Sequence, residues 1–517
     1  MLTSEDPKLP KRVLHTYHDG EHLQTRLYES KPGERAQYTT LSHCWGDNQP
    51  LTTTSTNDEQ HCDKIDWELL PKTFQDAIII THGLGLQYLW IDSLCIVQDS
   101  ENDWREQSAI MKDIYGYSYV TIAAAANDAF EHGLHLLERA KKDKVFACRT
   151  EILTLDKPGS KLFTRAWVLQ ERLLASRILY FFQGEVAFEC SNHIRCQCSD
   201  VSTLSPAVRD PFEADWGMQR DKSPAFRDLK YRFTEANISK IGKRLRLFAS
   251  RSVTCERDLC PSLSYDENVE MLELWNEILH HYIRRAITKT TDRLPALSGI
   301  AGAFGSTGAH GIYHAGLWET WFVHMLLWYV DQAEWKGMTP EPFTAEDLDT
   351  LLAPSWSWAK LRGAWTYRTR PYNRVVLAEM VESTVHLVSE DRFGSVYSDV
   401  VTVKGLTMEV QLKYGSVERA LTYAERFQRQ GVELIKEKDG GVATMWPDFV
   451  LDPLVDSGTI VTLLAVRMHV ENERHESIDG VVLQVVDDAD GRHRRLGIFN
   501  APTWWFHGSM RKSIKLS

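Results

Sequence analysis

The chain has 517 residues, of which 43% are hydrophobic and 25% charged, and its net charge is −12 at pH 7. This length predicts two or three domains, and the negative charge argues against broad binding to nucleic acid or anionic lipid. The chain begins without a signal-peptide core, and no apolar run approaches the roughly 20 residues of a membrane span. Nine cysteines, an odd number, favour reduced thiols, so we expect a cytoplasmic protein without a membrane span.

The first 87 residues predict a strand and a helix behind a polar leading segment. Residues 1–35 either cover the surface or form a short hairpin. Tyr38–Ser42 (YTTLS) predicts a strand, and His43-Cys44-Trp45-Gly46 and a Thr-rich loop follow it. Pro71 begins a helix, and Gly83-Leu84-Gly85 ends it. The apolar face of this helix consists of Phe74, Ala77, Ile78 and Thr81.

The stretch Tyr88–Ala126 predicts a strand, a helix and a second strand. Its first apolar run ends at Ile91, the helix has Asp103 as its expected N-cap, and the second run starts at Tyr119. Such a βαβ unit has a right-handed crossover and parallel strands. With the preceding strand and helix, it predicts a layered α/β domain at the N-terminus.

The middle of the chain is predominantly helical. Arg165–Leu174 predicts a helix, and a hairpin of two strands, Ile178–Phe182 and Val186–Cys190, follows it. Val201–Lys240 is polar and predicts a linker or a long loop. Three later segments have helical character: Asn268–Thr288, Pro295–Phe304 and Gly316–Tyr329.

The sequence after about Tyr372 is rich in predicted strands. Three runs carry this pattern: Val400–Val403, Thr459–Val466 and Val481–Val486. Asp490-Gly491 is a hairpin-turn signal. We therefore expect an α/β domain at residues 1–200, a helical region at 201–371 and a β-rich module at 372–517, which is α+β overall.

The strand end at Ser42-His43-Cys44-Trp45 is the first candidate site. His43 would act as a general base and Cys44 as a nucleophile if a carboxylate orients the imidazole. Ser42 and Trp45 would line the pocket for a substrate. The alternative is a tight turn anchored by a buried tryptophan.

Polar side chains also follow the strand that ends at Ile91. In parallel sheets, ligands bind beyond the carboxyl ends of the strands, so we expect Asp92 and Cys95 there as catalytic residues. Gln98 and Asp99 would bind the substrate in the same solvent-reachable cleft. The alternative is structural: Asp92 accepts backbone hydrogen bonds, and Cys95 packs as a small hydrophobe.

The predicted helix at 165–174 would cover this cleft. Four of its residues are candidates for substrate binding: Arg165, Trp167, Gln170 and Glu171. Arg165 would pair with Asp92 or Asp99, or bind a carboxylate or phosphate through two hydrogen bonds. A structural ion pair that fixes the helix to the sheet is the alternative.

The sequence predicts no cofactor and no metal. The spacing of four potential ligands does not fit common zinc sites; they are Cys190, His193, Cys196 and Cys198. Gly83-Leu84-Gly85 ends a helix, whereas the glycines of a dinucleotide fingerprint open one.

Six motifs follow one another within a nearly continuous stretch from Tyr38 to Cys190, the last of them ending at Phe181: YTTLSHCWG, LPKTFQDAI, GLGLQYLWIDSLCIVQDS, DWREQSAIMKDIY, VTIAAA and RAWVLQERLLASRILYF. They resemble the fungal heterokaryon-incompatibility (HET) domain. Later motifs, DRLPALSGIA, AGLW and APSWSWA, resemble the helical region that often follows it. The resemblance implies an intracellular fungal protein linked to non-self recognition and programmed cell death.

The HET domain is also distantly similar to the TIR fold, some members of which cleave NAD. A TIR-like NAD hydrolase needs a carboxylate near the ribose to stabilise an oxocarbenium-like transition state. The resemblance places this carboxylate where the chain has Gln107, whereas Glu106 lies one position earlier and about 100° away around the helix. Glu106 is the catalytic candidate, and an exposed glutamate favoured by the helix dipole is the alternative.

These features lead to three functional hypotheses. The first is a cytoplasmic effector of heterokaryon incompatibility and cell death that acts through contacts between its domains or with a protein partner. The second is a small-molecule enzyme, either a TIR-like NAD glycohydrolase or an enzyme of fungal secondary metabolism. The third is a binding or scaffold protein without turnover. The sequence indicates no oligomeric state.

Overall fold

The computed structural model divides the chain into two units, of which the first comprises Met1–Gly242, Arg285–Ile287 and Pro295–Ser306, and the second the rest. The three-part division at residues 200 and 371 stays a prediction. The structure describes residues 6–45, 51–126, 133–134, 160–182, 185–190, 194–196, 229–230, 232–234, 265–306, 310–330, 353–360, 365–367, 374–413, 432–435, 442–447, 458–472, 475–487 and 490–517.

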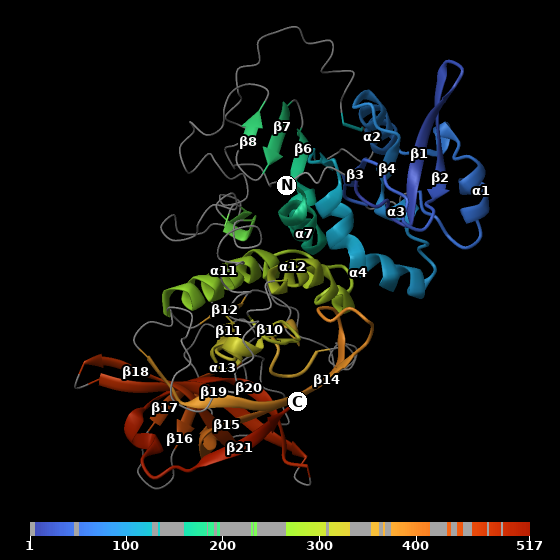
Figure 1. Cartoon of the computed structure of the whole chain (residues 1–517). Helices are drawn as coiled ribbons and strands as arrows, with labels where there is room; N and C mark the ends of the chain where they lie inside the picture. The colour runs from blue at the N-terminus through green and yellow to red at the C-terminus, as the bar shows by residue number, and fades with distance from the viewer. Residues whose placement is uncertain are drawn as a thin grey trace, which may run out of the picture. The chain divides into compact units, whose positions relative to one another are not determined.

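A mixed sheet of eight strands, in the order β2-β1-β4-β3-β5-β6-β7-β8, forms the centre of the first unit (Figure 1). Its strands are β1 (Arg12–Asp19), β2 (His22–Glu29), β3 (Tyr38–Ser42), β4 (Tyr88–Trp90), β5 (Val120–Ala124), β6 (Arg177–Phe182), β7 (Glu185–Cys190) and β8 (Ile194–Cys196). The central strands β4, β3, β5 and β6 are parallel, and the others pair antiparallel. The prediction of α/β layers in this region is confirmed.

The polar leading segment forms the β1–β2 hairpin and joins the sheet. Gly20, at a φ of 66°, makes the tight turn between the two strands. β1 pairs with β4 through Leu14 and Leu89. The sequence predicted a hairpin as one of two options, but the pairing with β4 is a long-range contact that it did not indicate.

Helices cover both faces of the parallel strands. Since α2 (Lys72–Gly83) leads from β3 to β4 and α4 (Glu101–Tyr117) leads back past β3 to β5, right-handed crossovers place the two helices on opposite faces. α7 (Ala166–Leu174) packs beside α4, and α12 (Pro295–Gly305) packs against both. The predicted strands at 88 and 119 are parallel, with β3 inserted between them.

The C-terminal end of α2 is as predicted, and its N-terminal end lies one residue after the predicted start, because Pro71 is the N-cap. Its expected face is buried, with Phe74 and Ile78 fully inaccessible. Gly85 has a φ of 76°, and the Leu86 amide donates to the Thr81 carbonyl at 3.1 Å, which closes the C-terminus in a Schellman-type turn.

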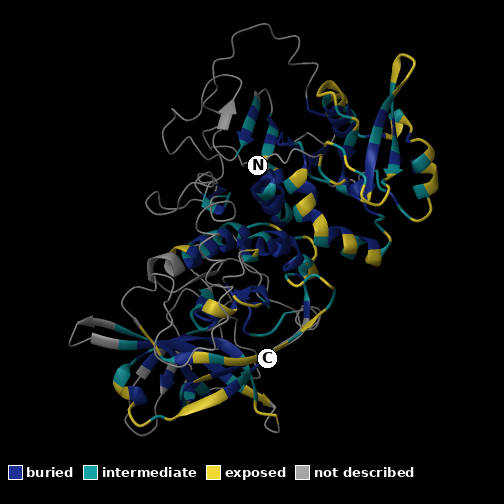
Figure 2. Cartoon of the chain, viewed as in Figure 1, coloured by how far each residue is buried: buried dark blue, intermediate teal, exposed yellow. Residues whose placement is uncertain are grey.

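The N-cap of α4 differs from the prediction. Ser100 caps the helix by accepting from the Asp103 amide, so Asp103 lies inside the first turn. Asp103 itself pairs with Arg12, a partner 91 residues away, and this ion pair draws its carboxylate away from the cap position. Exposed and buried residues alternate along α4 (Figure 2), and Met111, Ile114 and Tyr115 face the core.

The β-rich prediction for the C-terminal part is confirmed, and its strands close into a barrel. The ring consists of β15 (Val396–Lys413), β16 (Val432–Ile435), β17 (Val442–Pro447), β20 (Arg492–Pro502), β19 (His475–Asp487) and β18 (Ile460–Asn472). It closes because β15 pairs with both β16 and β18. Buried residues such as Leu463, Val482 and Phe499 fill its centre. Three strands extend it: β13 (Arg374–Val376), β14 (Ala378–Leu387) and β21 (Arg511–Leu516).

The second unit also contains the helix α11 (Tyr265–Ile283), close to the predicted bounds. The prediction of a helical Gly316–Tyr329 is confirmed only for its middle, where η6 (Glu319–Trp321) is followed by α13 (Phe322–Met325), whereas short strands flank this helical stretch. These strands are β10 (Leu317–Trp318), which pairs with β9 (Tyr313–His314), and β11 (Trp328–Val330), which pairs with β12 (Trp365–Tyr367). Trp356 and Trp358 are fully buried in the core.

The remaining short helices are α1 (Asp58–Asp63), η1 (Trp67–Leu69), α3 (Asp92–Cys95), η3 (Lys161–Thr164), η5 (Thr290–Asp292), η8 (Trp358–Lys360) and η9 (Thr503–Phe506). Most of the predicted linker at 201–240 lies outside the described residues, as do residues 183–184 between the two strands of the predicted hairpin. Among the described helices, none is both long and apolar enough to cross a membrane.

Candidate functional site

The carboxyl end of β3 is the point where the sheet topology reverses. The chain leaves β3 towards β4 on one side, whereas it leaves the adjacent strand β5 towards β6 on the other side. Open parallel sheets bind ligands at such a switch point. Ser42 is the last residue of β3, and His43 and Cys44 follow it.

Ser42 is hydrogen-bonded to a glutamate that lies 129 residues later in the chain. Its hydroxyl donates to Oε2 of Glu171 at 2.5 Å, and both side chains are buried. Burial raises the pKa of Glu171 to about 7, although Arg165 and the hydroxyls of Ser42 and Tyr115 act to lower it. Glu171 therefore exchanges a proton near neutral pH, which is the property of a general acid or base.

His43 lies beside Asp92 in a nearly closed environment. The side chain of His43 is 1% exposed and that of Asp92 22%, and Nδ1 of His43 is 3.7 Å from Oδ1 of Asp92. Neither ring nitrogen of His43 has a hydrogen-bond partner within the described part of the chain. Burial lowers the pKa of His43 to about 4, so the imidazole is neutral at pH 7. Asp92 is the member of the group that reaches solvent.

Trp45 and Arg165 fix the two sides of this group. The indole Nε1 of Trp45 donates to Oδ2 of Asp92 at 2.9 Å. The guanidinium of Arg165 donates to the His43 carbonyl at 2.5 Å. The predicted pairing of Arg165 with Asp92 or Asp99 is thus replaced by a bond to the backbone. The Arg165 cation lies at the end of β3, where it stabilises negative charge.

The two candidate thiols differ in their surroundings. Cys44 is half-buried, and burial raises the pKa of its thiol despite the neighbouring Arg165. The expectation that Cys95 opens into a solvent-reachable cleft is wrong, because its side chain is fully buried in the apolar core. Burial raises the pKa of Cys95 to about 12, which disfavours the reactive thiolate. Cys95 is therefore not suited to act as a nucleophile, contrary to the prediction that it is catalytic.

Gln98 and Asp99 shape the loop after Asp92 rather than reach Glu171. The amide of Gln98 donates to the carbonyls of Asp92 and Ile96, both at 3.0 Å. Asp99 accepts from the backbone and the hydroxyl of Ser55, at 2.8 and 2.6 Å. These bonds define the turn that presents Asp92.

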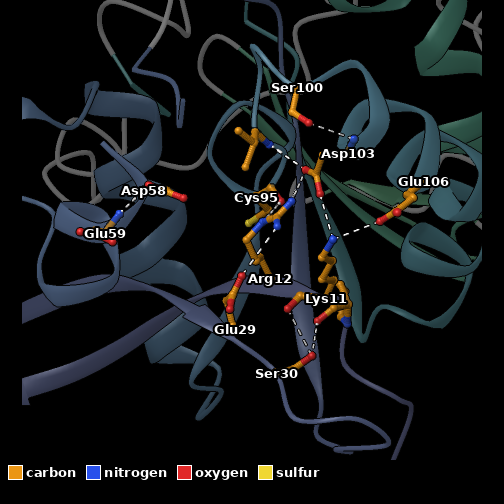
Figure 3. A network of polar contacts seen from close by, with 12 residues as sticks. Lys11, Arg12, Glu29, Ser30, Asp58, Glu59, Cys95, Ser100, Asp103 and Glu106 are labelled. Carbon is orange, nitrogen blue, oxygen red and sulfur yellow. Dashed lines mark hydrogen bonds and ion pairs between the residues drawn. The ribbon is translucent and has the colours of Figure 1, made fainter. Parts of the chain in front are cut away.

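A second network of polar contacts, which the sequence did not reveal, also holds the loop that follows Asp92 (Figure 3). Arg12 of β1 is buried; its Nε donates to the Cys95 carbonyl at 3.0 Å, and its other nitrogens pair with Asp103 and approach Glu29. Asp103 also accepts from the Val97 amide at 2.9 Å. Arg12 and Asp103 thereby tie the loop behind Asp92 to the leading hairpin.

Glu106 lies in this second network and not at the end of β3. It is 63% exposed and pairs with Lys11 at 3.0 Å (Figure 3). Its position on the outer side of α4 favours the structural alternative given for it above.

The other two candidates on α7, Trp167 and Gln170, pack against α4. Trp167 meets Trp104 of α4 edge-to-face, with ring centroids 6.1 Å apart. Gln170 is buried, and its amide contacts the sulfur of Met111 at 3.9 Å. Gln170 therefore helps to fix α7 to α4, while the next residue, Glu171, faces β3.

The four potential zinc ligands remain largely untested, because His193 and Cys198 lie outside the described residues. Within the described residues, no group of three or more His, Cys, Asp or Glu is arranged to hold a metal ion. The side chains gathered at the end of β3 are instead suited to proton transfer: a carboxyl that titrates near neutrality, a neutral imidazole, a partly exposed carboxylate and a cation.

Comparison with known families supports the sequence resemblance. Residues 38–171 match the family model described as "Heterokaryon incompatibility protein (HET)". The match begins at the first residue of β3 and ends at Glu171, so it encloses the whole group of side chains around Ser42. No curated protein and no solved structure matches the chain.

Proposed function

We propose that this chain, a HET-domain protein over residues 38–171, acts as a cytosolic effector of heterokaryon incompatibility and programmed cell death. Its functional centre is the group formed by Ser42, His43, Asp92, Arg165 and Glu171. Contact with a protein partner sets its activity.

One observation carries the assignment of this centre. The two ends of the matched region, β3 and Glu171, meet in space through the 2.5 Å hydrogen bond from Ser42. Burial that raises the pKa of a carboxyl to about 7 lowers the stability of the folded protein at neutral pH. Groups with such strongly shifted pKa values concentrate at functional sites. This favours a chemical role over a purely structural one.

The test is inducible expression of the full chain in a filamentous fungus, with growth as the readout. The wild-type chain is expected to arrest growth. Glu171→Gln and Asp92→Asn should relieve the arrest at equal protein abundance, because each keeps the shape of the side chain and removes its charge and proton exchange.

Glu106→Gln is the matched control, since it makes the same change at an exposed glutamate outside the centre. It should arrest growth like the wild type. A wild-type chain that leaves growth unaffected contradicts the effector role. Arrest by both centre variants contradicts the assignment of the centre.

A second candidate function is hydrolysis of the N-glycosidic bond of NAD, as in TIR-like enzymes. Glu171 and Asp92 provide two carboxyl groups in different environments, one buried with a raised pKa and one that reaches solvent. Asp92 would stabilise positive charge on the ribose, and Glu171 would accept the proton of the attacking water. Water adds to the ribose carbon, and nicotinamide leaves. Arg165 would bind a phosphate.

Purified full-length protein incubated with NAD tests this candidate by chromatographic measurement of free nicotinamide. We expect Glu171→Gln and Asp92→Asn to slow release by about 100-fold or more, the usual effect of removing an acid–base group, while Glu106→Gln has no effect. NAD that stays intact for hours at high protein concentration excludes the candidate.

A further inference from the structure

Two histidines from separate elements meet at the surface of the first unit. His18 lies near the end of β1, His82 lies in the last turn of α2, and both are exposed. Their Nε2 atoms are 3.1 Å apart. The ring centroids are 4.7 Å apart, and the ring planes are inclined by 66°. Rings that met head-on would have centroids farther apart, because both ring radii would add to the distance between the nitrogens. The two rings therefore converge at an angle.

We propose that His18 and His82 bind one divalent transition-metal ion through their Nε2 atoms, with water completing the coordination. Two nitrogens at the usual zinc distance of about 2.1 Å are about 3.4 Å apart in tetrahedral geometry and about 3.0 Å apart at a right angle. The observed separation of 3.1 Å lies between these values. Imidazole is a preferred ligand of zinc, copper and nickel.

The backbone holds both histidines in place without a metal. The His82 carbonyl accepts from the amide of Gly85, whose φ of 76° closes the end of α2. The Thr16 amide donates to the Gln87 carbonyl at 2.8 Å, which ties β1 to the segment that follows α2. Ligands mounted on fixed elements lose little freedom on binding.

The position of His82 adds an electrostatic argument. The last turn of a helix carries partial negative charge, so a cation is favoured there. In the part of the chain that the structure describes, no third His, Cys, Asp or Glu joins the pair. Water in the open positions distinguishes this from a closed structural zinc site.

A metal ion at this position would link the leading hairpin to the HET domain. His18 precedes the matched residues 38–171, whereas His82 lies inside them. The metal site shares no residue with the proton-transfer group at the end of β3. The inference therefore does not depend on the proposed function. A hydrogen bond between the two imidazole rings is the competing explanation of the short distance.

Calorimetric titration of the metal-free full-length protein with zinc chloride at pH 7.5 separates the two explanations. We expect one zinc site in the wild type, weakened at least about tenfold in both His18→Gln and His82→Gln, since each removes one of two ligands. His22→Gln, an exposed histidine on the same hairpin, should bind zinc like the wild type. Copper(II) bound in place of zinc should show two coupled nitrogens by electron paramagnetic resonance in the wild type and one in each single variant.

Equal zinc binding by all four proteins overturns the proposal, and so does the absence of wild-type binding below millimolar zinc. Melting curves without metal confirm that each variant folds. If one of the two variants melts early, the other decides the outcome, because the proposal requires the same loss from either histidine.

Discussion

Burial shifts the pKa values of two side chains at the end of β3 in opposite directions. It raises the pKa of Glu171 to about 7 and lowers that of His43 to about 4. In both residues burial disfavours the charged form. At neutral pH the centre therefore contains a carboxyl close to half-protonation and a neutral imidazole, with Asp92 and Arg165 as its nearest charged partners.

The raised pKa of Glu171 makes the stability of the protein depend on pH. A carboxyl whose pKa rises from 4.5 to about 7 on folding binds more protons in the folded state throughout that range, so stability falls as pH rises through it. The loss approaches roughly 3 kcal/mol above pH 7. Glu171→Gln removes this loss, so its melting temperature should rise relative to the wild type between pH 5 and 8. His43 titrates in both proteins and cancels from the difference. A difference that stays constant with pH would show that Glu171 is ionised in the folded protein.

Arg12 supplies the second prediction at this scale. Arg12→Gln leaves the Asp103 carboxylate without its buried cation and the Cys95 carbonyl without its donor. We expect a cost of about 2–3 kcal/mol and faster hydrogen exchange in the peptide that contains Val97. Lys11→Gln is the control, because Lys11 is 47% exposed and its ion pairs contribute little. Equal exchange in the two variants would contradict a positioning role for Arg12.

At the scale of elements, the signals that the sequence carried reliably were local. Three predictions that depend only on residues close together in the sequence are confirmed. They are the apolar face of α2, its Gly85 cap and the strand Tyr38–Ser42. The prediction of Asp103 as the N-cap of α4 was wrong, because Ser100 and Asp103 are both good capping residues and the sequence alone does not choose between them. A distant partner, Arg12, decided between them.

Helix packing provides a test at this scale. A Cβ atom on Gly299 of α12 would lie 2.6 Å from Oε1 of Gln170 and 2.9 Å from Cβ of Lys112, so Gly299→Ala should force α12 away from α7 and α4. Overpacking of this kind costs about 1–3 kcal/mol. Gly83→Ala is the matched control: it lies in a helix with no atom within 4 Å, so alanine should be neutral or slightly stabilising. The melting temperature should therefore fall in Gly299→Ala and should stay unchanged or rise slightly in Gly83→Ala.

At the scale of the whole molecule, the sequence predicted the secondary-structure class of each part, but not the order of its strands or the closure of the C-terminal barrel. β3 enters between β4 and β5, and β15 pairs with both β16 and β18, because strand order depends on contacts between distant segments. The same reason hid the bond between Ser42 and Glu171: both residues were candidates, but nothing local joined them. Likewise, Cys95 looked accessible because its burial arises from packing in the apolar core and not from its neighbours in the chain.

Each unit has its own core, so we expect each to unfold as its own cooperative transition. Gly480 tests this in the barrel, where an added Cβ would lie 2.1 Å from the Leu464 carbonyl oxygen and 2.5 Å from the ring of Phe499. Gly480→Ala should lower the free energy of unfolding of the second unit by about 1–3 kcal/mol or more. The Leu464 oxygen belongs to the backbone and cannot rotate away from the added Cβ atom as a side chain could. Gly299→Ala should lower only that of the first. Hydrogen exchange measured by mass spectrometry along a denaturant series assigns each transition to its peptides. If either variant shifts the peptides of both units together, the chain unfolds as one cooperative body, and the stability of the Glu171 centre then depends on the barrel.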